Sequence, residues 1–218
     1  MSNSNYDAGT CPLCSSLGAE FVVLINQREY LECENCDLVF VDPVLRPDRA
    51  TEYNHYQNHN NHIGDASYQK FLSTLFLPLI EKLPPHSSGL DYGCGPGPAL
   101  AYMMEQAGHV MSLYDPCFFP DQGILAETYD FICCSEVVEH FHNPAEEFKR
   151  LRKMLKPGGI LGVMTSFAPD SSQLKDWYYL QDITHVVFYR EKTFCWIAEE
   201  LEWNVCFPDA NLAFLIRN

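Results

Sequence analysis

The hydrophobic positions in the first 45 residues form short runs separated by polar turns. Apolar and β-branched residues cluster at 21–25, 28–33 and 38–41, with polar residues between them. Runs of this length and composition are typical of β-strands. We therefore predict a β-hairpin over residues 21–33 and a third strand over residues 38–41.

From residue 68 onward, amphipathic segments alternate with short runs that are almost wholly apolar. An amphipathic helix is predicted over 68–83, because Pro84 and Pro85 would end it. The segments expected after it are a strand leading into Asp91, a helix over 98–105, a strand over 109–115, a strand over 129–135, a helix over 145–155, a strand over 160–165, and a closing hairpin over 203–207 and 212–216. Such alternation of strand and helix predicts an α/β fold with a parallel, doubly wound sheet.

The composition fits one α/β core with a small appendage. The chain has 218 residues, with 29 Asp and Glu against 14 Lys and Arg, and a net charge of −15. This acidic balance argues against a nucleic-acid backbone as the main partner, since such binding uses clustered Lys and Arg. The longest apolar run, residues 71–80, is about half the length of a membrane span and contains Pro78. The first residues carry neither a basic nor an apolar stretch, so we expect no secretory signal and a cytoplasmic protein.

Four of the ten cysteines form two Cys-x-x-Cys units with 18 residues between them: Cys11, Cys14, Cys33 and Cys36. Two such units supply the four thiolates of a tetrahedral zinc site, and the alternatives are redox dithiols or disulfides. With four cysteines as ligands no coordination position stays open, so the zinc would be structural. We predict a zinc ribbon over residues 1–45. Because residues 1–50 hold three arginines, no lysine and eight acidic residues, a scaffolding or lid role fits this ribbon better than nucleic-acid binding.

A glycine-rich turn follows the first strand of the predicted sheet, with Asp91 opening it and Gly93, Gly95 and Gly97 at alternate positions. Glycines here allow positive φ angles and let a ligand approach the bare backbone. A dinucleotide fingerprint would need its third glycine at the position of Pro98, which disfavours a dehydrogenase. Asp115 ends the next apolar run, at roughly the ~20-residue offset where such folds place an acid for ribose hydroxyls.

Together these residues resemble the class I S-adenosylmethionine-dependent methyltransferases, whose first motif has this Asp-x-Gly-x-Gly-x-Gly form. The resemblance implies a methyltransferase domain over residues 83–218, with a seven-stranded sheet whose last strand is antiparallel. The family usually places a helix and a strand before strand four. Here only residues 116–128 intervene, and their prolines disfavour a regular helix. The cofactor-binding residues implied by the resemblance are Asp91, Gly93, Gly95, Gly97, Asp115, Pro116 and Ser135.

Residues 46–82 are expected to form a linker with lid helices. His55, His59 and His62 share one helical face by spacing, but we interpret this Asn- and His-rich segment as a solvated polar stretch rather than a metal site. Related methyltransferases use aromatic residues just before the core to cover the cofactor. The resemblance therefore suggests that role for Tyr53 and Tyr56.

Two segments bring ionisable groups to the carboxyl ends of the strands, where open α/β sheets bind ligands. Glu136, Glu139 and His140 follow the fourth strand, and His185 lies in the segment after the fifth. This spacing is similar to the metal site of small-RNA 2′-O-methyltransferases and of the O-methyltransferases of ubiquinone biosynthesis. Two alternatives follow for this catalytic cluster. It binds a second, divalent cation that lowers the pKa of an acceptor hydroxyl, or one of its histidines acts as a metal-free general base.

We therefore predict an S-adenosylmethionine-dependent methyltransferase that acts on a small-molecule acceptor, at oxygen. The alternatives are an RNA methyltransferase, and a non-catalytic protein that binds the cofactor or serves as a scaffold.

Overall fold

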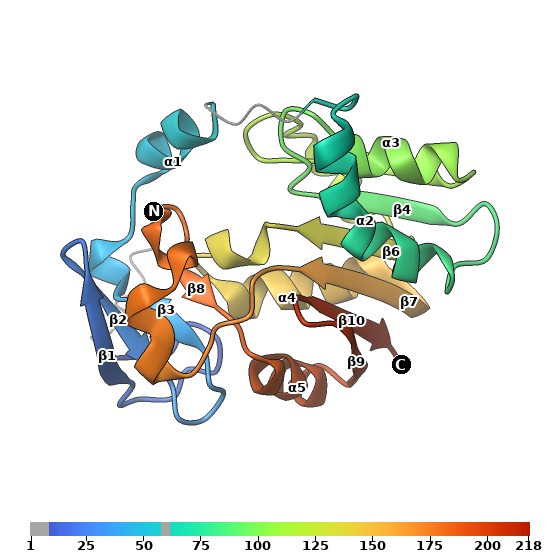
Figure 1. The fold of residues 1–218 in the computed structure, drawn as a ribbon. Coiled ribbons are helices and arrows are strands. Elements are labelled where there is room, and N and C mark those ends of the chain that lie inside the picture. Colours follow the sequence, from blue (N-terminus) through green and yellow to red (C-terminus); the bar gives the residue numbers. More distant parts are fainter. Residues whose placement is uncertain (1–8, 58–61) are drawn as a thin grey trace.

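A central sheet, which has six strands, forms the body of the protein (Figure 1). The computed structural model describes residues 9–57 and 62–218. The strand order is β5-β4-β6-β7-β10-β9. The bounds are β4 Ser88–Tyr92, β5 Val110–Tyr114, β6 Tyr129–Ser135, β7 Leu155–Met164, β9 Trp203–Asp209 and β10 Leu212–Arg217. The strands β5, β4, β6 and β7 run parallel, and β10 is antiparallel to both of its neighbours. The predicted α/β fold and antiparallel last strand are thus confirmed.

The expected number of seven strands is wrong for the described residues, because the sheet has six. The missing strand would stand beyond β5, in the segment that connects it to β6. That segment contains only a short 3-10 helix, η2 (Gln122–Ala126). A crossover to a further parallel strand needs a dozen or more residues of its own. The prolines and short length that disfavour a helix here leave no room for the strand either.

Helices cover both faces of the central sheet (Figure 1). Helices α2 (Ala66–Ile80) and α3 (Ala99–Gln106) pack on one face, against Phe131 and Cys133 of β6. Helices α4 (Pro144–Met154) and α5 (Glu191–Glu200) pack on the other face, against Ile132 and Cys134. Successive residues of a strand point to opposite faces, so the apolar middle of β6, residues 131–134, serves two hydrophobic cores at once.

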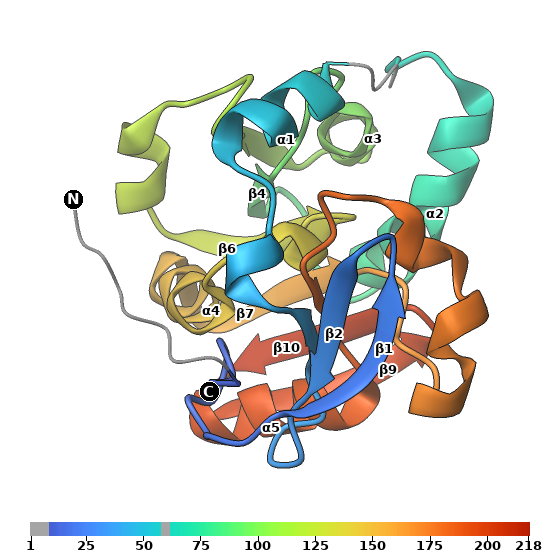
Figure 2. The same cartoon turned by 90° about the vertical axis from the view of Figure 1, so that its left-hand side faces the viewer.

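A second sheet has four strands in the order β1-β2-β3-β8. Figure 2 shows its strands β1 and β2 in front of the central sheet. Strands β1 (Glu20–Ile25), β2 (Arg28–Glu32) and β3 (Val39–Val41) are the predicted hairpin and third strand. Strand β8 (Val187–Phe188) comes from the segment between β7 and α5 and pairs antiparallel with β3. The N-terminal region and the segment after β7 therefore share one sheet.

Short helices complete the fold. They are α1 (Arg49–Tyr56) and the 3-10 helices η1 (Pro43–Leu45), η3 (Val138–His140), η4 (Ser171–Asp176) and η5 (Tyr178–Gln181). Asp48 precedes α1 as its N-cap, and its carboxylate accepts a hydrogen bond from the N–H of Thr51 at 2.8 Å. Among the described residues, none of the helices has the length and apolarity that crossing a bilayer requires.

Candidate active site

A cavity of about 1200 Å³ opens at the carboxyl ends of β4, β5 and β6. Its walls come from the turns after these strands, from α1 and α2, and from residues 178–185. Ligands of open α/β sheets bind in this position. The cavity therefore brings together the glycine-rich turn, the acid after β5 and the histidines, which the sequence analysis assigned to one site.

The glycine-rich turn forms the floor of the cavity. Gly93 has a φ of +79° and Gly95 a φ of +62°. A Cβ atom on Gly93 would lie 2.6 Å from a methyl carbon of Val137, so this position has no room for a side chain. The N–H of Gly93 donates to the carbonyl of Tyr114 at 2.7 Å, which ties the turn to the end of β5.

Asp115 lies at the end of β5 and lines the cavity. One of its carboxylate oxygens accepts the N–H groups of Cys117 (2.8 Å) and Phe118 (3.0 Å), and the other accepts the N–H of Gly95 (3.0 Å). The carboxylate thus connects the glycine-rich turn to the loop after β5. An ionised carboxylate has about four acceptor sites, so the oxygen facing Gly95 can still accept a hydroxyl.

The other predicted cofactor residues fall into two groups. Gly93, Gly95, Pro116 and Ser135 line the cavity, whereas Asp91 and Gly97 do not. Asp91 instead accepts the N–H of Ala101 at 3.3 Å, near the start of α3. The pKa of the Asp91 carboxyl is raised to about 7, chiefly by burial; the hydrogen bond from Ala101 opposes the shift and the charge of Asp115 adds to it. The geometry thus suggests that Asp91 supports the turn from behind.

The cavity fits the methyl-donor cofactor that the sequence analysis predicts. The hydroxyl oxygen of Ser135 is buried at the cavity wall and has no hydrogen-bond partner among the described residues. A buried polar atom without a partner is costly unless a ligand or water satisfies it. Together with the bare backbone at Gly93 and Gly95, this oxygen provides a polar contact for a ligand with hydroxyl or amino groups.

A cluster of two carboxyl and two hydroxyl groups lies at the cavity near the carboxyl end of β6. The hydroxyl of Tyr179 donates to Glu139 in a short hydrogen bond and lies 3.0 Å from a carboxylate oxygen of Glu136. Thr165 donates to the second oxygen of Glu139 at 2.9 Å. Burial raises the pKa of both carboxyls, that of Glu136 to about 8, with the negative charge of Glu139 contributing to the shift at Glu136. Glu136 lines the cavity, while Glu139 is fully buried behind it.

Two histidines lie beside this cluster, with their ring centroids 4.8 Å apart. Nδ1 of His140 is 3.0 Å from the carbonyl of Thr184, and Nδ1 of His185 is 2.9 Å from the carbonyl of Tyr179. A carbonyl only accepts, so Nδ1 carries the proton in each neutral ring and Nε2 is the basic nitrogen. Burial lowers the pKa of His185, against the charge of Glu139, which raises it. The site therefore presents a neutral imidazole at His185 near pH 7.

Helix α1 covers the histidine end of the cavity. Nε2 of His55 lies 3.1 Å from Asp182, and Nε2 of His142 lies 2.6 Å from Glu52. Tyr56 lines the cavity and packs edge-on against His140, whereas Tyr53 is 43% exposed and is not part of the wall. His59, which shares the helical spacing of His55, lies outside the described residues.

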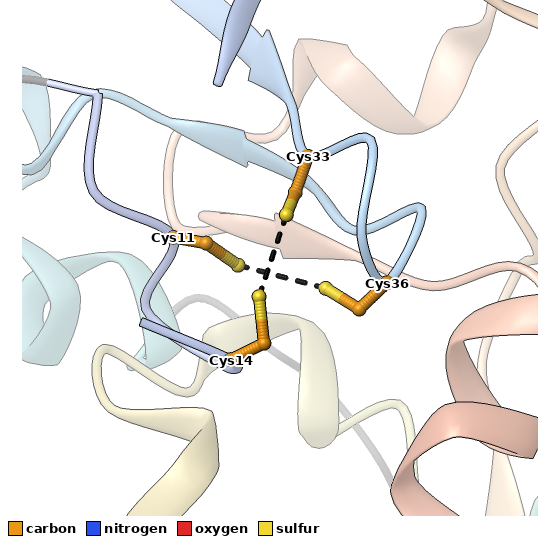
Figure 3. Close-up of side chains that lie close together, drawn as sticks. All are labelled: Cys11, Cys14, Cys33 and Cys36. Carbon is orange, nitrogen blue, oxygen red and sulfur yellow. Dashed lines mark hydrogen bonds between the residues drawn. The ribbon is translucent and has the colours of Figure 1, made fainter. Parts of the chain in front are cut away.

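The four N-terminal cysteines lie apart from this cavity, where the turn between β2 and β3 meets the preceding loop. Their sulfur atoms point toward a common centre (Figure 3) and lie within 4.8 Å of one another. The Cys11–Cys36 and Cys14–Cys33 sulfur pairs are 3.6 and 3.4 Å apart. Four sulfurs at about 2.3 Å from a tetrahedral zinc would be about 3.8 Å apart. The geometry is compatible with a zinc ribbon.

The sequence analysis assigned neither Tyr179 nor Thr165 to the acidic cluster, where both contact Glu139. Tyr179 appears in the sequence only as one of several aromatic residues near 177–179. Nothing in its local pattern connects it with Glu139, which lies 40 residues earlier. Tyr68 of α2 also lines the cavity, at the first turn of the predicted amphipathic helix.

The parallel sheet, the glycine-rich turn and the acid after β5 define a class I S-adenosylmethionine-dependent methyltransferase. A family model described as a methyltransferase domain matches residues 61–206. The chain belongs to this methyltransferase family. No curated protein matches it in sequence.

Solved structures of methyltransferases share this fold at low sequence identity. One is the 1,6-didemethyltoxoflavin-N1-methyltransferase of Burkholderia thailandensis with S-adenosylhomocysteine bound (16% identity, TM-score 0.50, covering 91% of this chain and 97% of that one). Another is an O-methyltransferase family protein of the same organism (13% identity, TM-score 0.52, covering 79% and 62%). A third is the mitomycin 7-O-methyltransferase MmcR (12% identity, TM-score 0.50, covering 77% and 66%). The chain spans less than two thirds of the length of the last two proteins, and 57% of that of CalO1, a methyltransferase in calicheamicin biosynthesis.

Proposed function

We propose that this methyltransferase acts on an oxygen atom of a small-molecule acceptor. S-adenosylmethionine supplies a methyl group that is already activated, so the chain has to orient the acceptor and remove its proton. The observation that carries the proposal is the pair of imidazoles, His140 and His185, at the cavity wall. Their Nδ1 atoms meet backbone carbonyls, which leaves Nε2 as the atom that takes a proton.

His185 is the better placed general base. Its lowered pKa keeps the ring unprotonated near neutral pH, as a base requires. Glu139 stands behind the histidines, and its negative charge would stabilise the ring after proton uptake. Glu136 shares the hydroxyl of Tyr179 with Glu139 and faces the cavity, so we assign it to the acceptor side of the site.

We place the cofactor over Gly93 and Gly95, with its ribose hydroxyls on Asp115, whereas Gly97 is not part of the cavity wall. Pro116 and Ser135 would border it, and Asp91 would support the turn. The volume of about 1200 Å³ supports this placement, because it leaves room for an acceptor beside the cofactor. Two of the similar structures, the O-methyltransferase family protein and the mitomycin 7-O-methyltransferase, support oxygen as the methylated atom. The toxoflavin enzyme, in contrast, is an N1-methyltransferase.

The test begins with calorimetric titration of S-adenosylmethionine into the wild type, where we expect one site per chain. A panel of hydroxylated small molecules is then screened with radiolabelled cofactor. For an acceptor found this way, His185→Gln should lose methyl transfer and keep cofactor affinity. A wild type without cofactor affinity would contradict the proposal, and so would a fully active His185→Gln enzyme.

A divalent cation at the same cluster is the second candidate. The observation that favours it is that ligand atoms of Glu139, His140 and His185 lie within 4.8 Å of one another. These residues would hold a cation such as Mg²⁺, Mn²⁺, Fe²⁺ or Zn²⁺, which would lower the pKa of the acceptor hydroxyl. Mild chelation distinguishes the two mechanisms, because only the cation mechanism predicts loss of activity and recovery on adding one divalent ion.

We further propose that Cys11, Cys14, Cys33 and Cys36 hold a structural zinc. The proposed organisation is a ribbon over residues 1–45, a linker with lid helices over 46–82 and the methyltransferase domain over 83–218. Four free thiols in contact fit a reducing compartment, so we propose a cytoplasmic location. The acidic charge of the chain supports a small molecule over RNA as the acceptor.

A further inference from the structure

Strand β2 of the ribbon reaches the backbone of the segment that carries His185. The guanidinium of Arg28 donates to the carbonyl of Asp182 at 3.1 Å and to the carbonyl of His185 at 2.6 Å. The hydroxyl of Tyr30 donates to the carbonyl of Leu180 at 3.1 Å. Two side chains of one ribbon strand therefore hold three carbonyl groups of the segment 180–185.

The next ribbon strand fixes the same segment on its C-terminal side. The N–H of Val41 donates to the carbonyl of Val186 at 2.9 Å, and Val39 pairs with Phe188 across β3 and β8. Figure 1 shows β8 beside β3 in the ribbon sheet. On the other side, the N–H of Val186 donates to the carbonyl of Glu139 at 2.9 Å. His185 is thus held between the ribbon and the turn that carries the acidic cluster.

Arg28 occupies an unusual environment for a cation. Its residue is only 8% exposed, and burial lowers the pKa of its guanidinium. Within the described residues, its hydrogen bonds go to carbonyl groups, and its guanidinium lies 5.5 Å from the centre of the Tyr30 ring. Burying a cation is costly, and an apolar side chain of similar size would often be as stable. What the apolar side chain lacks is a rigid fork of donors that meets two carbonyl groups at once.

The cysteine cluster connects directly to the strand that carries Arg28. Cys33 follows β2 immediately, and Cys36 lies shortly before β3. The N–H of Cys33 donates to the carbonyl of Leu38 at 3.0 Å, which closes the turn between the two strands. A metal bound there would fix the spacing of the strands that grip residues 180–188.

We propose that Arg28 is a positioning residue, which sets the place and orientation of the His185 imidazole through the backbone of residues 182–185. The inference rests on the proposed catalytic role of His185, and it assigns the ribbon a function: to hold the segment that carries the base. The ring is oriented from two directions, because its Nδ1 meets the carbonyl of Tyr179 while its own carbonyl accepts Arg28.

The experiment compares Arg28→Met and Arg28→Lys with the matched control Lys192→Met. Lys192 also connects the methyltransferase domain to the ribbon, through Asp37, but it does not touch residues 180–185. Long-range ¹H–¹⁵N spectra report the tautomer of each imidazole, and His185→Gln identifies the His185 signals. We expect a single Nδ1–H tautomer of His185 in the wild type and in Lys192→Met. In Arg28→Met these signals should shift or split between tautomers.

Cofactor affinity is measured on the same samples and should stay within about two-fold of the wild type in every variant. An unchanged His185 spectrum in folded Arg28→Met overturns the inference. If Arg28→Met does not fold, Arg28→Lys decides, since an ammonium group lacks the planar fork; an unchanged His185 spectrum in that variant overturns the inference as well. A wild type that binds no S-adenosylmethionine refutes the proposed function, whereas the His185 spectrum still tests the positioning role of Arg28.

Discussion

Individual carboxyl groups of this chain have their proton affinities moved in opposite directions by their surroundings. Burial raises the pKa of Asp91 to about 7. Asp130 lies near the surface, where burial acts against ionisation but hydrogen bonds from Lys156 and Ser88 outweigh it and lower the pKa. The same side chain therefore favours opposite charge states at two places in one sheet.

The Asp91→Asn variant should change how stability depends on pH. A carboxyl whose pKa is higher in the folded protein than in the unfolded chain loses stability as the pH rises between the two values, here from about 3.8 to about 7. The full loss is at most about 4 kcal/mol for a shift of this size. Asn at this position stays neutral, so thermal unfolding of Asp91→Asn should show a higher melting temperature than the wild type at pH 8 and little difference at pH 4.

Asp130→Asn serves as the control with the opposite sign. Its lowered pKa contributes stability above the unfolded pKa, and this stability is lost as the pH falls through the folded pKa. Asp130→Asn should therefore destabilise the protein at pH 8. If the melting temperatures of both variants, relative to the wild type, changed in the same direction with pH, the opposite pKa shifts of Asp91 and Asp130 would be contradicted.

Asp115→Ala should weaken cofactor binding. The variant removes a charged acceptor from the proposed ribose site, and a hydrogen bond to a charged group contributes about 1.5–3 kcal/mol. Calorimetric titration of S-adenosylmethionine should show a loss of roughly 10- to 150-fold in affinity. Asp121→Ala is the matched control, because Asp121 also accepts a loop N–H, that of Gly123, but is not part of the cavity wall. Equal affinities in both variants would disprove the placement.

For single residues, the sequence predicted a place in the site only where the residue belongs to a short-range motif. The positions of Gly93 and Asp115 at the cavity could be predicted because a turn motif and an acid at a strand end are short-range features. Tyr179 and Arg28 could not, since their partners lie 40 and 157 residues away. The backbone of Glu136 has a φ of +54°. Positive φ is uncommon for residues other than glycine, so a glutamate in the sequence gives no indication of it.

Among the elements, the turn between β4 and α3 depends most on the absence of side chains. Gly93→Ala should destabilise the protein by roughly 2–4 kcal/mol, because a left-handed backbone position costs about 1 kcal/mol and the contact with Val137 adds overpacking. Gly108→Ala is the control, with a φ of +91° and open space around its Cβ. Urea unfolding should show only the strain of about 1 kcal/mol there. Similar losses in both variants would rule out the crowding at Val137.

The ribbon should depend on all four of its cysteines. We expect native mass spectrometry to find about one zinc per chain, and Cys14→Ser to lose it, because three thiolates leave the tetrahedral site incomplete. Cys195→Ser is the control, since this exposed cysteine of α5 lies outside the cluster. A Cys14→Ser protein that stays folded and retains zinc would contradict the structural site.

The elements themselves could largely be predicted from hydrophobic periodicity. The strands β4 to β7 and the closing hairpin appear where apolar runs predict them, because a buried parallel strand requires such a run. The seventh strand was expected from the resemblance to a family, not from residues 116–128, and it is the element that proved wrong. Strand β8 has two residues, too few for a pattern to identify.

At the scale of the whole molecule, the charge of −15 should keep the protein from binding RNA. A surface dominated by acidic groups repels phosphates and lacks the counterion release that drives such binding. Fluorescence anisotropy with a short single-stranded RNA should show no binding at 150 mM salt. Binding that weakens steeply with added salt would favour the alternative of an RNA methyltransferase.

Because β3 pairs with β8, the ribbon sheet cannot be completed until most of the chain has been synthesised. Tyr30 and its partner Leu180 are 150 residues apart. At about 5–20 residues per second, the ribosome would present the ribbon roughly 8–30 s before the segment that completes its sheet. During this interval the apolar edge of β3 lacks the neighbour that covers it in the finished protein. Early metal loading would hold the nascent ribbon in a form ready to receive β8, and expression of residues 1–45 alone would yield a sheet with one edge open.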